Sequence, residues 1–190
     1  MRRSVGSTCR SSRATDRPGV MHPAEPRPGG VLSFWRWEKM SEQDVFMRRA
    51  LELARANIAA GGRPFGAVLV KDGKVLAEAA NGIHASHDPT DHAEMRAIRL
   101  ASAVLGSPRL DGCSVYASGH PCPMCLAAMY LCGIQQAWFA YSNEDAEPFG
   151  LSTGAVYARL AEGPAAPASG LCQWKPAGEQ GLYAEWGMKP

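Results

Sequence analysis

Two short patterns in this chain have the residue types and spacing needed for chemistry. Cys122 and Cys125 stand three positions apart at the start of an apolar run, and His92 is followed two residues later by Glu94. Cysteines at positions i and i+3 of a helix lie on one face, so both sulfurs can reach a single metal ion. Pro123 fits the first turn of such a helix, where its missing N–H has no partner to lose.

The cysteine pair alone leaves three interpretations open: a metal site, a redox pair or two inert core residues. No second Cys-x-x-Cys exists to complete a four-sulfur site. His92 provides a third ligand, and one imidazole with two thiolates leaves the fourth position of a tetrahedral zinc ion open, which is typical of a catalytic zinc. Glu94 is then available to move protons. The alternative is structural, with Asp91 capping a helix and Glu94 completing a capping box.

Together the two patterns read His92-x-Glu94 and Pro121-Cys122-x-x-Cys125, which is the signature of the zinc deaminases. The stretches "GRPFGAVLVKDGKVLAE", "NGIHASHDPTDHAEMRAIRLA" and "PCPMCLAAMYLCGI" resemble the bacterial guanine deaminase branch of the cytidine deaminase superfamily. The resemblance covers about 42 to 160. It implies Zn²⁺ as cofactor, held by His92, Cys122 and Cys125, with Glu94 as the catalytic proton shuttle.

The resemblance also implies substrate contacts. It places Asn81 and Ala93 in the pocket, and it places Glu144 or Asp145 where guanine deaminases carry an acid that accepts from N1–H and the 2-amino group of guanine. The alternative for Asn81 is a turn residue in "NGIH", and the alternative for the two acids is a solvated loop. These four residues are the predicted substrate-binding set.

Two features depart from, or extend, this resemblance. Relatives usually carry Glu where this chain has His120, which puts the substrate in doubt more than the reaction type. Relatives also use C-terminal aromatic residues to close the pocket, sometimes from the other subunit. Tyr183 and Trp186 could act in this way, but we expect them to pack in the core.

The elements that must position these residues follow from periodicity and turn signals. Apolar residues at helical spacing after Ser41 predict a first helix over 43–60, and Asp72-Gly73 predicts a hairpin turn between two strands. The remaining expectations are a helix ending at Gly106, a strand over 113–118, a helix from Cys122, a strand over 137–141, a loop over 143–154, and short helices over 155–161 and within 179–188. This order predicts an α/β fold, a three-layer α/β/α sandwich of the cytidine deaminase-like type whose mixed sheet begins with an antiparallel hairpin.

Composition sets the limits of the domain. The chain has 190 residues, enough for one sizeable core. Residues 1–39 are rich in Arg, Ser, Pro and Gly, so we expect a disordered extension upstream of a natural start at Met40, followed by one deaminase domain over 40–190. Residues 1–39 carry a net charge of +5 and residues 40–190 carry −3. A mildly acidic domain is poorly suited to bind the phosphate backbone of a nucleic acid.

The predicted function is hydrolytic deamination of a purine nucleobase, guanine to xanthine, with release of ammonia. The alternatives are a tRNA-specific adenosine deaminase, a deaminase of another nucleobase or nucleoside such as cytosine or guanosine, and a non-catalytic zinc-stabilised binding module. The resemblance implies a homodimer, and the cysteine usage and lack of a membrane-length apolar run indicate a reducing, cytoplasmic location.

Overall fold

A computed structural model of the chain describes residues 41–163, 170–178 and 181–187. The predicted disordered extension over 1–39 and the predicted start at Met40 lie outside the described residues. None of the described helices is long and apolar enough to cross a membrane.

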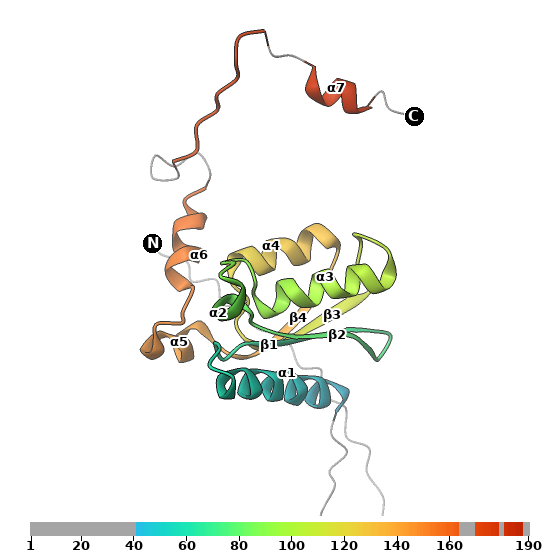
Figure 1. Cartoon of the computed structure of the whole chain (residues 1–190), viewed down its shortest axis with the longest axis vertical. Helices are drawn as coiled ribbons and strands as arrows, with labels where there is room; N and C mark the ends of the chain where they lie inside the picture. Colours follow the sequence, from blue (N-terminus) through green and yellow to red (C-terminus); the bar gives the residue numbers. More distant parts are fainter. Residues whose placement is uncertain (1–40, 164–169, 179–180, 188–190) are drawn as a thin grey trace, which may run out of the picture. The chain divides into compact units, whose positions relative to one another are not determined.

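A four-stranded mixed sheet forms the centre of the fold, with strand order β2-β1-β3-β4 (Figure 1). β1 pairs antiparallel with β2 and with β3, whereas β3 and β4 are parallel. Asp72 and Gly73 join β1 and β2 with φ values of 50° and 70°, so both turn residues are in the left-handed region, as the predicted hairpin requires. The strands span Gly66–Lys71 (β1), Lys74–Ala80 (β2), Cys113–Gly119 (β3) and Gln136–Tyr141 (β4).

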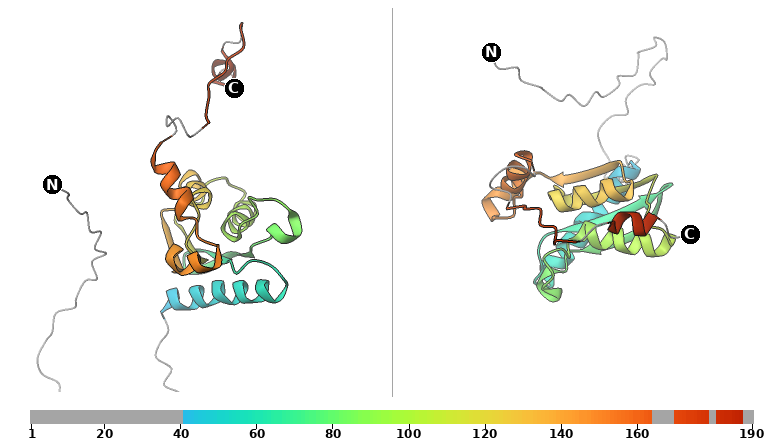
Figure 2. Two further views of the ribbon diagram at one scale, coloured as in Figure 1. Left: turned by 90° about the vertical axis from the view of Figure 1, so that its left-hand side faces the viewer. Right: turned by 90° about the horizontal axis from the view of Figure 1, so that it is seen from above.

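Helices cover both faces of this sheet. α1 packs on one face, and α3 and α4 lie side by side on the other, which confirms the predicted three-layer α/β/α sandwich (Figures 1 and 2). The helices are α1 (Glu42–Ala59), α2 (Ile83–Ser86), α3 (Ala93–Leu105), α4 (Pro123–Cys132), α5 (Asn143–Ala146), α6 (Gly154–Ala161) and α7 (Leu182–Gly187), with a 3₁₀ turn over Glu147–Phe149.

The core divides into two clusters because β1 is buried on both of its faces. Leu69 points to the larger cluster, beneath α3 and α4, where Val115 and Met129 are also fully buried. Val68 points to the smaller cluster against α1, where Tyr116 stacks on Trp138 with ring centroids 4.9 Å apart. The larger cluster also contains Cys113 and Cys132, and it supports the N-terminal ends of α3 and α4.

Two predictions about the C-terminal third are wrong. The segment predicted as a loop over 143–154 contains α5 and the 3₁₀ turn, because Ser142 and Asp145 form a capping box that starts a helical turn. Tyr183 and Trp186 are not core residues, since 89% and 76% of their surfaces are exposed. They belong to α7, a six-residue helix that buries none of its residues in the described part of the chain.

Candidate active site

The predicted metal ligands lie at the N-terminal ends of α3 and α4, the two helices on the same face of the sheet. His92 is the N-cap of α3 and Cys122 is the N-cap of α4, and both have extended backbone angles. Neither side chain makes a capping hydrogen bond, so both are free to bind another group. The partial positive charge of a helix N-terminus also favours the thiolate form of cysteine.

The three donor atoms are close enough to share one ion. Nδ1 of His92 lies 3.5 Å from the Sγ atoms of both Cys122 and Cys125, and the two Sγ atoms lie 3.5 Å apart. Zinc bonds of about 2.0 to 2.3 Å in tetrahedral geometry separate neighbouring ligand atoms by about 3.5 to 3.8 Å. The residues therefore fit zinc. Among the described residues, this cluster contains no fourth His, Cys, Asp or Glu ligand, which leaves one position open.

Electrostatics in the cluster favour a thiolate. A hydrogen bond with Cys125, followed in size by one with His92, lowers the pKa of Cys122 to about 4 against the opposing effect of burial. The hydrogen bond with Cys122 and burial raise the pKa of Cys125, and the hydrogen bond with Cys122 raises the pKa of His92. Cysteine ligands bind a divalent cation as thiolates, so zinc binding would release the thiol protons.

Glu94 lies in the first turn of α3 with only 6% of its surface exposed. Burial is the largest influence on its carboxyl group and raises its pKa. The predicted alternative, a capping box with Asp91, is not formed: the N-cap is His92, and Asp91 pairs instead with Arg96 and Arg99. Glu94 is therefore a buried carboxyl group with no capping role.

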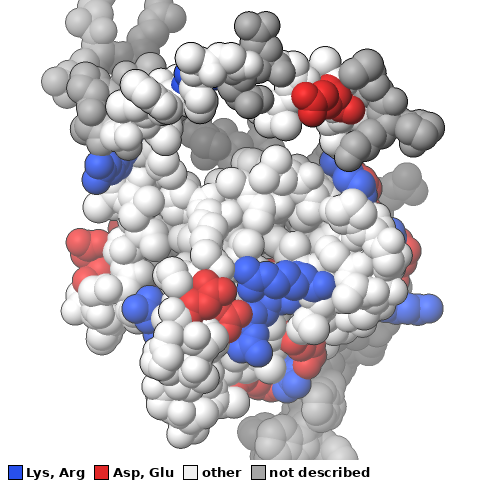
Figure 3. Space-filling model, turned by 45° about the horizontal axis from the view of Figure 1, so that its top comes forward, with Lys and Arg blue, Asp and Glu red and all other residues white. Residues whose placement is uncertain are grey.

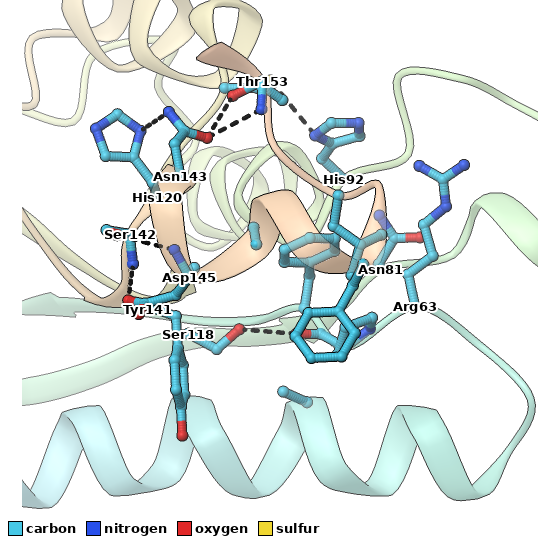
Figure 4. A pocket seen from close by; sticks show the side chains of 18 of the residues that line it. Arg63, Asn81, His92, Ser118, His120, Tyr141, Ser142, Asn143, Asp145 and Thr153 are labelled. Atoms are coloured by element: carbon cyan, nitrogen blue, oxygen red, sulfur yellow. Dashed lines mark hydrogen bonds between the residues drawn. The ribbon is translucent and has the colours of Figure 1, made fainter.

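A cavity of about 320 Å³ opens beside this cluster and is lined by His92, Glu94 and Cys122. Figure 4 shows Asn81 and His92 at one side of the cavity and His120 and Asn143 at the other. The volume is at the lower end of the range for small-molecule sites.

Of the predicted substrate-binding residues, the structure brings Asn81 and Asp145 to the cavity. Asn81 is 2% exposed, and its Oδ1 accepts the Ile83 N–H at 3.2 Å, so it also has the predicted turn role. Asp145 caps α5 through Oδ2, which accepts the Ser142 N–H at 2.8 Å. Ala93 is fully buried and Glu144 is exposed, and neither belongs to the cavity lining.

The wall opposite Asn81 contains residues that sequence reasoning missed. Oδ1 of Asn143 accepts the Thr153 N–H at 2.9 Å and its hydroxyl at 3.2 Å. This fixes the amide orientation and directs Nδ2 toward His120, whose Nδ1 is 3.4 Å away. Behind the wall, the Tyr157 hydroxyl donates to the Pro121 carbonyl at 2.6 Å. Only the Ser142–Asp145 capping signal could have placed part of this wall from sequence.

The fold and the cluster together define a zinc-dependent deaminase. The family described as the cytidine and deoxycytidylate deaminase zinc-binding region matches residues 40–141, and the chain belongs to this family. Its members use zinc for hydrolytic deamination, so the chain is a zinc-dependent hydrolase, as predicted.

Several relatives refine this placement. The chain is 44% identical over 118 residues to the guanine deaminase of Bacillus subtilis, covering 62% of this chain and 76% of that protein. The crystal structure of the B. subtilis guanine deaminase superposes with a TM-score of 0.67 at 38% identity, covering 75% of this chain and 92% of that one. The tRNA-specific adenosine deaminase of Aquifex aeolicus is 37% identical over 98 residues, 52% of this chain and 65% of that protein.

Proposed function

We propose that this protein hydrolyses a free purine base, guanine before others, to give xanthine and ammonia. The observation that carries the proposal is the juxtaposition of three ligand atoms, an open fourth position and the buried Glu94 in one cavity. Similarity to the B. subtilis guanine deaminase supports the choice of base, since it exceeds similarity to the tRNA enzymes in both identity and coverage. The deaminase domain in this proposal spans 40–190.

Each residue has a distinct part in the proposed reaction. When bound, zinc supplies the Lewis acid that turns water into a nucleophile at neutral pH. His92, Cys122 and Cys125 hold the ion. Glu94 accepts a proton from the attacking water and donates it to a ring nitrogen. It then carries the second water proton, from the newly formed hydroxyl group, to the leaving amine, so that water and guanine become xanthine and ammonia.

Asn81 and Asp145 would hold the base. Oδ1 of Asn81 is occupied by the Ile83 N–H, which leaves its Nδ2 to donate to an acceptor on the base. Asp145 uses Oδ2 to cap α5, which leaves Oδ1 to accept from the base. A carboxylate suits the N1–H donor of guanine, next to the carbon that loses its amine, and would repel the unprotonated N1 of adenine.

A tRNA-specific adenosine deaminase is the second candidate, because several relatives carry that activity in their names. This activity requires a basic surface that binds the phosphate backbone of the tRNA. On the face in Figure 3, however, the central group of Lys and Arg side chains lies directly beside Asp and Glu side chains. The net charge of −3 outside residues 1–39 also disfavours this candidate.

We also propose a cytoplasmic homodimer. β4 is an edge strand of the sheet, and Phe139 and Tyr141 on it are 43% and 54% exposed. On α4, Tyr130 and Leu131 are 67% and 80% exposed. A single chain therefore leaves a sizeable apolar surface exposed to solvent, as is typical of a protein–protein interface. The thiols at the site need a reducing compartment to stay available for zinc. Light scattering of the purified protein should give twice the mass of one chain, and a monomer at micromolar concentration would reject the dimer.

The substrate is tested with a panel of guanine, guanosine, adenine, cytosine and a tRNA anticodon stem-loop, with ammonia release as the readout and metal content measured on the same sample. We expect guanine to give the highest kcat/KM and the stem-loop to give none. Bound zinc without ammonia from any member of the panel would reject the enzyme and favour a zinc-stabilised binding module.

A further inference from the structure

The loop that carries Asn81 is tied to the start of α3 on both of its sides. Before Asn81, the Ala80 carbonyl accepts a hydrogen bond from Nη1 of Arg96 at 3.0 Å. After Asn81, the Gly82 N–H donates to the Asp91 carbonyl at 2.9 Å. The segment from Asp91 to Arg96 also contains His92 and Glu94. These hydrogen bonds therefore connect the loop of Asn81 to the segment that carries a metal ligand and the proposed proton shuttle.

The side chains of Asp91 and Arg96 pack directly against Gly82. A Cβ atom at this position would lie 2.1 Å from Oδ2 of Asp91 and 2.6 Å from Nη1 of Arg96. The backbone angles of Gly82, φ −109° and ψ 0°, are accessible to other residues, so the constraint here is steric: a side chain would displace the ends of the Asp91 and Arg96 side chains. The close approach of the loop to α3 therefore depends on the missing side chain.

Asp91 links these parts electrostatically. Its side chain is 16% exposed, and its Oδ1 lies 3.7 Å from Nε of Arg96 and 3.6 Å from Nη1 of Arg99. The two arginines differ in what else they reach: Arg96 binds the Ala80 carbonyl beside Asn81, whereas Arg99 binds the Thr90 hydroxyl at 3.2 Å. Arg96 thus connects α3 to the loop, and Arg99 does not.

We propose that Asp91 and Arg96 are positioning residues that fix the Asn81 amide relative to His92 and Glu94. The backbone hydrogen bonds of Asn81 itself run elsewhere: its N–H donates to the Phe65 carbonyl and its carbonyl accepts from Asn57. These hold the loop to Phe65, just before β1, and to α1, and the Asp91–Arg96 contacts add the link to the chemistry. Because Asn81 faces the base in the proposed function, movement of its loop weakens contact with the base in the ground state and in the transition state alike. The kinetic consequence rests on the proposed function.

The kinetic test compares Arg96→Gln and Gly82→Ala with Arg99→Gln, which serves as the matched control. Arg96→Gln removes the bond to Ala80, and Gly82→Ala forces Asp91 and Arg96 away. We expect both variants to raise KM for guanine by about tenfold while kcat changes by less than about threefold and zinc content stays constant, because contact with the base is lost before and during the reaction alike. Arg99→Gln should stay within about twofold of the wild type. An unchanged KM in both test variants, or an equal rise in Arg99→Gln, would overturn the proposal.

A second readout does not depend on turnover. Amide hydrogen exchange in the zinc-loaded protein should be faster at Gly82 in Arg96→Gln than in the wild type, and unchanged in Arg99→Gln. Equal exchange at Gly82 in all three proteins would contradict the positioning role. If the wild type deaminates no base, the proposed function fails, and exchange at Gly82 still decides whether Asp91 and Arg96 hold the loop.

Discussion

The two sides of the cavity are built in different ways. On the metal side, His92 and Cys122 begin two helices of 13 and 10 residues that pack on a sheet. The two cysteines are buried, His92 is half-buried, and the three donor atoms lie 3.5 Å apart. On the opposite side, Asn143, Asp145 and Thr153 belong to short turns held by their own hydrogen bonds, and the surrounding chain is largely exposed. We propose from this difference that the scaffold fixes the reaction, while short segments that can change independently choose the substrate.

Removing a metal ligand should have the largest effect, because it removes the reaction altogether. We expect Cys125→Ala to lose stoichiometric zinc and to reduce ammonia release to the background rate, since two remaining ligands hold zinc weakly. Metal analysis and an ammonia assay on the same preparation measure both effects. Cys113→Ala is the control, because Cys113 is also a buried thiol but lies outside the cluster. If Cys125→Ala kept both its zinc and its turnover, the reaction would not depend on the metal side in the way proposed here.

Glu94→Gln should separate metal binding from proton transfer. Glutamine keeps the size of the buried side chain but cannot accept the water proton, so turnover should fall by about 10²- to 10⁴-fold while zinc remains bound. Steady-state kinetics with metal analysis provides the measurement. A variant with near-normal turnover would remove Glu94 from the mechanism.

On the opposite wall, the two predicted acids should behave differently. Asp145 lines the cavity and Glu144 does not, so Asp145→Asn should lower kcat/KM for guanine by about 10- to 100-fold, as expected for a lost hydrogen bond to a charged group. Glu144→Gln should change it by less than about twofold. Asparagine retains a side-chain oxygen that can accept the Ser142 N–H, so the cap of α5 should survive. If neither variant affects the use of guanine, this loop does not recognise the base.

Tyr157→Phe tests whether α6 supports the metal side from behind. The substitution removes the 2.6 Å bond to the Pro121 carbonyl, next to Cys122, but keeps the ring that packs edge-on against His120. Zinc affinity, measured by competition with a chelator, should fall by about three- to tenfold. An affinity equal to that of the wild type would show that the metal loop is held without α6.

The smallest effect is expected for an ion pair between α1 and β2, whose residues do not line the cavity. The Arg49 guanidinium donates to both carboxylate oxygens of Glu78, at 2.9 and 2.7 Å, and lowers the pKa of that carboxyl group. A carboxyl group with a lowered folded-state pKa stabilises the fold above its ordinary pKa and loses this contribution as the pH falls through the lowered value. Glu78→Gln should therefore lower Tm by about 1 to 3 °C at pH 7 but not at strongly acidic pH, with kcat/KM unchanged. An equal Tm difference at both pH values would mean that the charge of Glu78 is not responsible.

The metal side was predictable from sequence because its signals are local. Cys122 and Cys125 are three residues apart, His92 and Glu94 are two apart, and Asp72-Gly73 specifies its hairpin without help from distant residues. The number of ligands that a catalytic zinc needs links the His pattern to the Cys pattern, and the resemblance to the zinc deaminase signature makes the combination specific.

The rest of the site depends on contacts between distant residues, which single-residue patterns do not reveal. Tyr157 reaches Pro121 across 36 positions, and Arg96 reaches Ala80 across 16. The helical turn Asn143–Ala146 has a local signal in Ser142 and Asp145, but Pro148 and Gly150 in the same segment favour a loop. Tyr183 and Trp186 were expected in the core on hydrophobicity alone, and such residues need not be buried within one chain.

The central claim is that one imidazole and two sulfurs bind zinc and leave one position open. X-ray absorption at the zinc K-edge of the purified protein tests this directly. We predict one zinc ion per chain with two sulfur neighbours at about 2.3 Å, one histidine nitrogen at about 2.0 to 2.1 Å and a remaining position that a competitive base analogue perturbs. A zinc ion saturated by four protein ligands and indifferent to the analogue, or a purified protein that binds no zinc, would contradict the account.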